Sequence, residues 1–310
     1  MKITKLQTAT SLLVLVLLIG VTSCKKNKLN KQTTSSEDNS AAENMFDDIF
    51  NMTDKFDDTE SDIDGSNKTS FWPKDTTYTH TVYSCLEITK QFIDSVTFER
   101  TITFNFGTTG CTTGDGRVRT GKIIAHRIGR YRDAASTTVI TTDDYTVDDY
   151  TVDGTKTVTN LGENSANQQQ YSVVVSGDII TPTGETITWN STRTRTWIEG
   201  ANTWFFGTLN DDGTLDSLYR YGVEGIYDDV WEVTGSGGGI NREGRAFDVD
   251  ITTALRVQWC APYVEVTEGV IEVQPEDLKL RTVDFGDGIC DNEATATIGN
   301  NSYTFEMRKN

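Results

Sequence analysis

An alternation of apolar and polar residues with a period of two is the feature that most constrains how this chain can fold. From about residue 76 onward the alternation recurs, most clearly over residues 101–106, 246–251 and 255–259. A period of two places every second side chain on the same face of a strand, so these segments are predicted to be half-buried β-strands. Only four prolines occur in the 310 residues. Residues 76–310 are therefore predicted to form one β domain.

Turn-forming dipeptides separate the alternating segments. Asp153-Gly154, Thr183-Gly184, Asp212-Gly213 and Glu243-Gly244 each fall where one segment ends and the next begins. Such dipeptides favour β-hairpins. No helical segments lie between the strands to form crossovers, so neighbouring strands are expected to pair antiparallel. The predicted fold class is all-β: a large antiparallel meander of long hairpins, arranged as an open barrel or a sandwich.

An internal repeat supports the hairpin interpretation. The segment Val173–Thr192 aligns without gaps onto Val233–Thr252 at an offset of 60 residues, with Gly177 matching Gly237. Each copy is predicted to be one long hairpin.

Residues 1–23 have the pattern of a cleavable export signal. Lys2 and Lys5 precede an apolar run over residues 11–20, which is shorter than the ~20 residues that a membrane-spanning helix needs. The run ends in Val21-Thr22-Ser23-Cys24, which resembles the lipobox of bacterial lipoproteins. That resemblance implies cleavage before Cys24 and acylation of its sulfur and its new amino group, which together make a firm membrane anchor. The alternative is an ordinary signal peptide followed by a chance cysteine.

Residues 24–75 have the polar, acidic composition of a flexible tether, with one exception. Ser40-Ala-Ala-Glu43 has the form of a helix capping box. Apolar residues then recur at helical spacing: Met45, Phe46, Ile49, Phe50, Met52 and Phe56. We expect a short amphipathic helix at about 41–57 that packs against the β domain. The alternative is a helix for a partner or a membrane surface, although its acidic polar face is unfavourable for a membrane.

Four cysteines remain besides Cys24: Cys85, Cys111, Cys260 and Cys290. In an exported chain an even number favours two disulfides, for which three pairings are possible. Residues 104–111 resemble residues 283–290, and each segment ends in a cysteine that follows another at a similar distance. The repetition favours Cys85 with Cys111 and Cys260 with Cys290.

The charge of the chain argues against one class of partner. The sequence holds 28 Lys and Arg against 46 Asp and Glu, a formal net charge of −18. An acidic surface repels nucleic acid, so no nucleic-acid partner is expected.

One strand carries a candidate ligand face. Trp189, Arg193, Arg195 and Trp197 share one parity of the segment 186–197, and threonines with Asn190 occupy the other. Arginine between tryptophans stacks on rings and grips carboxylates, so an acidic or glycan ligand is one interpretation. The alternative is that the tryptophans cap the core.

A second candidate is a weak calcium site. Asp284, Asp287 and Asp291 surround a glycine turn, and calcium is bound by carboxylate oxygens. A full calcium loop needs more ligands at regular spacing, and a tight turn beside a disulfide explains the same residues.

No catalytic signature is found. Neither Gly-x-Ser-x-Gly nor His-Glu-x-x-His occurs, and the two histidines lie far apart in the sequence. We predict no catalytic residue and no cofactor, and therefore a non-enzymatic binding or structural role. The alternative is a surface glycan hydrolase that uses paired carboxylates.

Several segments together resemble an uncharacterised family of exported β-rich lipoproteins of Bacteroidota. The resembling segments are residues 43–50, 105–111, 115–122, 188–197, 233–236, 241–245 and 284–292. The resemblance implies a lipid-anchored protein of the outer membrane, facing the periplasm or the outside. It implies a β-rich fold and brings no activity with it. The partners expected are the membrane, through the lipid on Cys24, and an envelope protein or a glycan.

Overall fold

The computed structural model describes residues 33–49, 52–53, 77–201, 228–261 and 263–307. It consists of one helix over residues 33–49, hereafter the helix, followed by a single 14-stranded sheet. The strands are β1 (Thr77–Val82), β2 (Leu86–Asp94), β3 (Glu99–Thr112), β4 (Val118–Ile128), β5 (Thr137–Val147), β6 (Tyr150–Glu163), β7 (Gln169–Ile180), β8 (Thr186–Glu199), β9 (Val230–Ile240), β10 (Ala246–Cys260), β11 (Tyr263–Pro275), β12 (Arg281–Asp287), β13 (Glu293–Ile298) and β14 (Asn301–Glu306).

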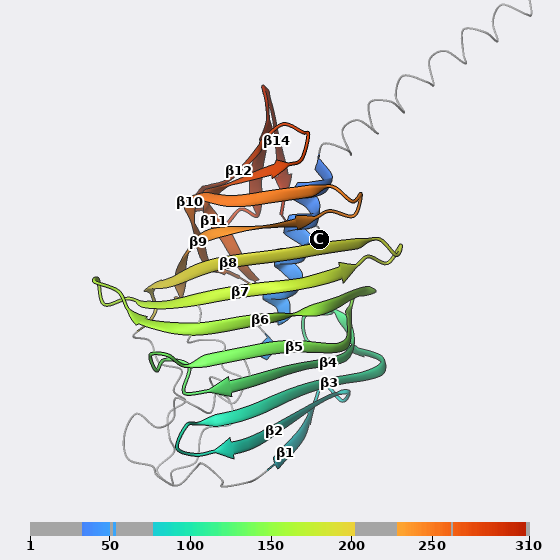
Figure 1. The fold of residues 1–310 in the computed structure, drawn as a ribbon, viewed down its shortest axis with the longest axis vertical. Helices are drawn as coiled ribbons and strands as arrows, with labels where there is room; N and C mark the ends of the chain where they lie inside the picture. The colour runs from blue at the N-terminus through green and yellow to red at the C-terminus, as the bar shows by residue number, and fades with distance from the viewer. Residues whose placement is uncertain (1–32, 50–51, 54–76, 202–227, 262, 308–310) are drawn as a thin grey trace, which may run out of the picture.

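The order of strands in the sheet is their order in the sequence. Each strand is hydrogen-bonded to the next along the chain, and the pairs are antiparallel, as in β2 with β3 and β10 with β11. β1 and β14 are the two edge strands, so the sheet is open (Figure 1). The predicted all-β antiparallel meander is confirmed.

One face of the sheet is buried, and the helix lies against it. Ile102, Phe104 and Phe106 of β3 are at most 2% exposed, whereas the residues between them are only half-buried. The helix runs across the strands rather than along them (Figure 1), and its residues Phe46 and Ile49 belong to the same core cluster. The face that carries this cluster is hereafter the inner face.

The helix begins earlier than the sequence predicts. The chain is already helical at residue 33, the first residue described, whereas the start was expected at about 41, and Ser40 of the predicted capping box is an exposed residue within the helix. Thr34 and Ser35 are buried against the turn between β9 and β10, where Asn241 Nδ2 donates to Ser35 Oγ at 2.9 Å. Tertiary packing thus extends the helix past a local start signal. The end expected near residue 57 lies outside the described residues.

The residues expected to form a tether are in part a component of the core. Met45 and Met52 are buried in the cluster that the strands share, together with Phe46 and Ile49. This is the packing against the β domain that the helical spacing predicts. The β domain therefore includes residues 33–49 in addition to the sheet.

Two paired glycines let the helix approach the sheet closely. Gly154 of β6 is the register partner of Gly177 of β7. A Cβ on Gly177 would lie 2.6 Å from ring carbon Cζ of Phe46, and one on Gly154 would lie 2.9 Å from it. The Phe46 ring also stacks on Trp189, with ring centroids 5.7 Å apart. The ring therefore sits in a notch that only glycines leave open.

Both predicted disulfides are present. Cys85 is bonded to Cys111 and Cys260 to Cys290, each with a Cα–Cα distance of 5.5 Å. The first joins the residue before β2 to β3, and the second joins the end of β10 to the segment after β12. Loops of this length are stabilised by ~3 kcal/mol when a disulfide closes them.

We predict that Gly177→Ala lowers the free energy of unfolding by ~1–3 kcal/mol, because the added methyl overpacks the core. It would meet Phe46 Cζ and, at 2.5 Å, the carbonyl oxygen of Asp153. Urea unfolding followed by circular dichroism measures the change. Val174→Ala is the matched control on the same strand, since Val174 is 44% exposed on the opposite face. Equal midpoints for the two variants would contradict the notch.

Candidate functional site beneath the helix

Acidic residues of the helix pair with basic residues that project from the sheet. The pairs are Asp38 with Arg242, Glu43 with Arg193 at 2.8 Å, Asp47 with Lys156 at 2.9 Å, and Asp48 with Arg119 at 2.7 Å. The basic partners belong in turn to the β9–β10 turn, β8, β6 and β4. The helix is thus bound at four places along its length.

Three of the four basic partners are buried, because strand parity turns them toward the inner face. Arg119 is 0% exposed, Lys156 2% and Arg193 7%. A buried charge is costly unless it is paired and hydrogen-bonded. The carboxylates of the helix supply that pairing, so the helix is required for this arrangement of the sheet.

The helix predicted at about 41–57 was expected to have an acidic polar face, but two acidic residues of the observed helix are largely buried. Asp38 is 0% exposed, and the Asp48 side chain is 15% exposed. The reason is that the inner face of the sheet is cationic around its apolar centre, which no pattern within the helix itself reveals. Sequence reasoning also missed Arg119, Lys156 and Tyr145. Their only signal is the inward parity that each shares with apolar residues of its strand.

Two of the four predicted ligand residues contact the helix. Trp189 Nε1 donates to Asn39 Oδ1 at 3.0 Å, and Arg193 Nη2 donates to Glu43 Oε1 at 2.8 Å. The acidic group that Arg193 binds therefore comes from the chain itself. Binding of an external acid or glycan on this face remains a prediction.

The other two predicted ligand residues gather around Trp231 of β9. The Trp197 ring stacks on Trp231 with centroids 4.8 Å apart, and the Arg195 guanidinium lies 4.9 Å from the centre of the same ring. Trp197 Nε1 donates to Asp229 Oδ1 at 3.0 Å. Trp189 and Trp197 are 3% and 5% exposed, which agrees with the alternative that they cap the core.

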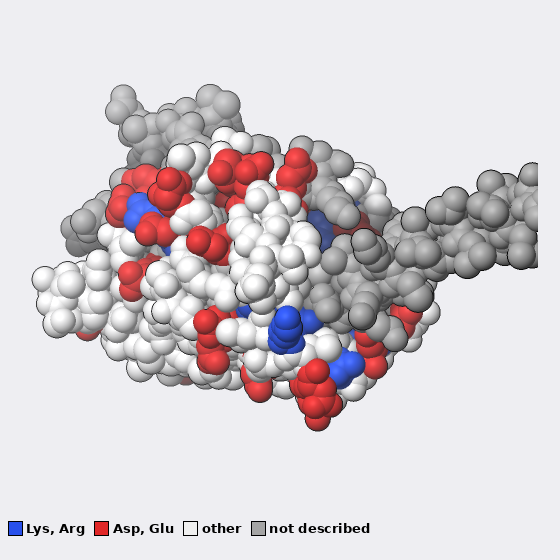
Figure 2. Space-filling model, turned by 90° about the horizontal axis from the view of Figure 1, so that it is seen from above, with Lys and Arg blue, Asp and Glu red and all other residues white. Residues whose placement is uncertain are grey.

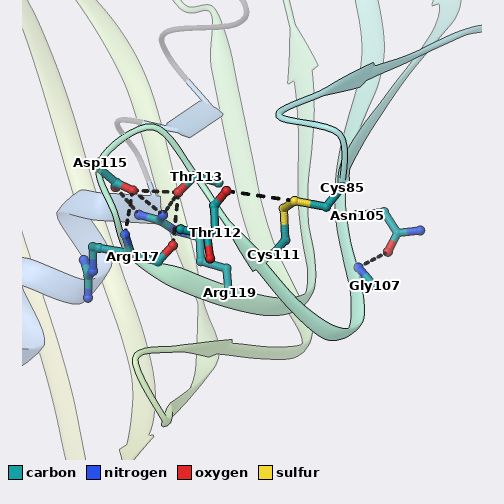
Figure 3. Close-up of a disulfide and its surroundings, with 9 residues drawn as sticks. All are labelled: Cys85, Asn105, Gly107, Cys111, Thr112, Thr113, Asp115, Arg117 and Arg119. Carbon is teal, nitrogen blue, oxygen red and sulfur yellow. Dashed lines mark hydrogen bonds and ion pairs between the residues drawn. A yellow bond between two sulfur atoms is a disulfide. The ribbon is translucent and has the colours of Figure 1, made fainter.

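Arg119 is the centre of a polar cluster that joins β4 to the helix, to β5 and to the β3–β4 turn. Its Nη1 and Nη2 atoms donate to the two carboxylate oxygens of Asp115 at 2.9 and 2.7 Å. Nη2 also donates to Asp48, Nη1 to Thr113 Oγ1, and Nε to the Tyr145 hydroxyl at 3.3 Å. Figure 3 shows Arg119 beside the turn that holds Thr113 and Asp115, next to the disulfide of Cys85 and Cys111. All three guanidinium nitrogens have acceptors.

The electrostatics of this cluster fix its charges. Burial raises the pKa of Asp115, but hydrogen bonds from Arg119 and Thr113 outweigh it and hold the pKa well below the usual range. Burial lowers the pKa of Arg119, but Asp115 and Asp48 raise it above the usual range. Burial, and then the charge of Asp48, raise the pKa of the Tyr145 hydroxyl. At neutral pH Arg119 and Asp115 are therefore charged and Tyr145 is neutral, so the cluster serves to hold the helix and the sheet together.

The calcium candidate is only partly assembled. Asp284 and Asp291 line one shallow hollow of about 230 Å³ together with Glu293, and Asp287 does not line it. Asp284 Oδ1 accepts the N–H of Gly286 at 3.0 Å, and Asp291 Oδ1 accepts the N–H of Glu293 at 2.9 Å. Among the residues described, the one group of three metal-ligating side chains whose ligand atoms lie within 4.8 Å of one another is Cys260, Glu265 and Cys290. Both of those cysteines are in a disulfide.

Cys24 lies outside the described residues. Within the described ranges, no helix is long and apolar enough to cross a bilayer. Comparison of the chain with protein-family models, with curated proteins and with solved structures finds no match.

We predict that Arg119→Ala lowers the free energy of unfolding by ~2–4 kcal/mol, because it removes a fully buried guanidinium together with its hydrogen bonds to Asp48 and Asp115. Lys122→Ala is the matched control. It removes a cation from the same strand, but from an exposed pair with Asp143, so it should leave the unfolding midpoint near that of the wild type. Urea unfolding at pH 7 measures both. If both variants lost the same stability, the cluster around Arg119 would not be what holds the helix to the sheet.

Acid should destabilise the fold through Asp115. Its pKa is lower in the folded chain than the ~3.9 of an unfolded aspartate. The stabilisation is therefore complete above about pH 4 and is lost as the pH falls toward the folded value. We predict that Asp115→Asn is less stable than the wild type at pH 7 but loses less of its stability between pH 5 and pH 2.5. If urea unfolding showed the same loss of stability for both proteins between pH 5 and pH 2.5, this assignment to Asp115 would be contradicted.

Proposed function

We propose that this chain is a membrane-anchored lipoprotein of the cell envelope, held in the outer membrane through lipid on Cys24. The support is the coincidence of a short apolar run, small residues and a cysteine at residues 11–24. Two disulfides in the β domain are consistent with an exported chain.

The position of the helix refines the proposed anchor. Residue 33, nine residues after Cys24, already belongs to the helix that packs on the sheet. Nine residues span at most ~30 Å when fully extended. A lipid on Cys24 would thus hold the β domain within about one domain diameter of the bilayer, closer than a tether extending to residue 75 would allow.

For the β domain we propose a non-enzymatic binding or structural role, and one observation carries this proposal. The inner face is where a curved sheet would form a ligand cleft, and the chain's own helix fills it with paired charges. Recognition of a partner then falls on the outer face and the edges of the sheet.

The outer face has the character of a binding or structural surface. One row of hydroxyl-bearing residues runs across five strands, β5 to β9, with each residue the register partner of the next: Thr137, Thr159, Ser172, Thr194 and Thr234. Such a row offers hydrogen-bonding groups but no acid, base or activated nucleophile in mutual reach. Elsewhere the surface is acidic, and Figure 2 shows clusters of Asp and Glu with few basic residues on the end seen from above.

The rival function is a surface glycan hydrolase with paired carboxylates. The observation that favours the hydrolase is the hollow beside β12 and β13, which is lined by Asp284, Asp291 and Glu293. A glycan panel tests the rival directly. Turnover by the wild-type chain that Asp291→Asn and Glu293→Gln each abolish would replace the non-enzymatic proposal.

The anchor is tested by acyl labelling in the native membrane. We predict that Cys24→Ala abolishes incorporation of labelled fatty acid and releases the protein from the membrane fraction, because the thioether has no sulfur to form on. Ser23→Ala is the control, since it keeps a small residue before the cysteine. Continued labelling of the Cys24→Ala protein would refute the proposal.

The binding role is tested by recovery of the acylated wild-type protein from its membrane after cross-linking. A stable envelope protein recovered with it supports a structural role, and a bound glycan supports a glycan-binding module. Recovery of neither, with the lipid anchor intact, would contradict the binding role.

A further inference from the structure

The edge strand β14 exposes both its side chains and its outer backbone. All six residues from Asn301 to Glu306 are exposed, and β14 pairs with β13 alone in the described sheet. Natural sheets protect such edges with proline, lysine, bulges or covering segments, because unpaired N–H and C=O groups attract another strand. β14 contains neither proline nor lysine, and its ladder with β13 runs without a register shift.

The register fixes which backbone groups face outward. Ile298 pairs with Asn301 across a two-residue turn, and the N–H of Met307 donates to the Asn292 carbonyl at 2.9 Å. In an antiparallel ladder the hydrogen-bonding direction alternates along the strand. Odd-numbered residues of β14 therefore bond to β13, and the N–H and C=O groups of Ser302, Thr304 and Glu306 point away from the sheet.

The same strand carries two aromatic side chains at the margin of the core. Tyr303 and Phe305 are 41% and 40% exposed. They are the register partners of Ala296 and Ala294, and Ala294 is 3% exposed within the core cluster. The apolar inner face thus continues to the edge of the sheet, where the partly exposed rings of Tyr303 and Phe305 lie beside the two alanines.

We propose that β14 is a homodimer interface, at which the strand pairs antiparallel with β14 of a second copy of this chain. The two-fold axis passes beside Thr304, so that Thr304 faces Thr304 of the second copy. This register joins the outward groups of Ser302, Thr304 and Glu306 in hydrogen-bonded pairs. The two sheets become one continuous sheet.

Side chains match in this register. Tyr303 of each copy faces Phe305 of the other, and Ser302 of each copy faces Glu306 of the other. Aromatic and Thr–Thr cross-strand pairs stabilise antiparallel sheets by ~0.2–1 kcal/mol each. The Thr304 hydroxyl already lies 3.2 Å from Thr295 Oγ1 on the neighbouring strand, so the threonine pair continues an existing polar row.

Charge favours a second copy at a strand edge such as β14 over contact through the broad faces of the molecule. Copies of a chain with net charge −18 repel each other over most of their surface. β14 carries one charged residue, Glu306. In the proposed register the two Glu306 residues are four residues apart along the strand, or ~13 Å, which exceeds the ~8 Å screening length at physiological salt.

A six-residue edge buries less than the ~1,200 Å² of a standard interface, so the dimer should be weak and dependent on concentration. Anchoring in a membrane, if it occurs as proposed above, would raise the local concentration. The pairing itself does not depend on the anchor.

Cysteine cross-linking tests the register, with the full chain exported so that its native disulfides form. Facing residues in a hydrogen-bonded pair have Cα atoms ~5.5 Å apart, within the range of a disulfide. Thr304→Cys should therefore give a disulfide-linked dimer on a non-reducing gel. Ser302→Cys alone is the matched control and should give none, because the two copies of residue 302 are ~13 Å apart. The double variant Ser302→Cys with Glu306→Cys should restore the dimer.

Sedimentation of the wild type and of Thr304→Pro tests the association without added cysteines. Proline removes an N–H that points away from β13, so it blocks the dimer and is tolerated at an edge. Thr304→Lys places two positive charges at the axis and should have the same effect if proline perturbs the hairpin. A wild type that stays monomeric at all concentrations would overturn the proposal. So would equal cross-linking of Thr304→Cys and Ser302→Cys, or open-ended polymers instead of dimers.

Discussion

The buried ion pairs between the helix and the sheet are the interaction on which the rest of the structure depends. Arg119, Lys156 and Arg193 are almost fully buried, and each has a carboxylate of the helix as partner. Replacing such pairs by apolar residues often costs nothing, but removing one partner alone costs several kcal/mol. An apolar helix could slide along an apolar sheet, whereas four charged contacts at unequal intervals set both its direction and its register.

The reach of the helix explains where the disulfides lie. Seventeen residues of helix are ~26 Å long, and neighbouring strands are ~4.8 Å apart. A helix of that length covers the middle of a 14-stranded sheet but neither end. The described contacts run from Arg119 on β4 to Arg242 in the β9–β10 turn. The two disulfides fasten the strands beyond these limits, β2 to β3 on one side and β10 to the segment after β12 on the other.

The parts of this structure that local chemistry determines could be predicted from the sequence. Alternation indicated the strands, and the repeated cysteine segments predicted the correct disulfide pairing. Thr183-Gly184 and Glu243-Gly244 do lie in hairpin turns, but Asp153-Gly154 lies inside β6, where Gly154 makes room for Phe46 instead of forming a turn. The start of the helix could not be predicted, because Thr34 and Ser35 are helical through contacts with a turn some two hundred residues away. The alternation of side chains along β8 predicted that Trp189 and Arg193 share one face of the strand. Only the fold shows that Asn39 and Glu43 of the helix are their partners.

The way in which the chain distributes its charge limits where it can associate. The acids that face the inside neutralise the buried cations, as Asp48 does for Arg119 and Glu43 for Arg193. The remaining acids lie outside, so broad contact between two copies would gather like charges and is disfavoured. A strand edge avoids this cost, because it binds through backbone groups and needs little surface. The inner face is already covered by the helix, so the row of hydroxyl-bearing residues on the outer face and the unprotected edge of the sheet are the places left for recognition.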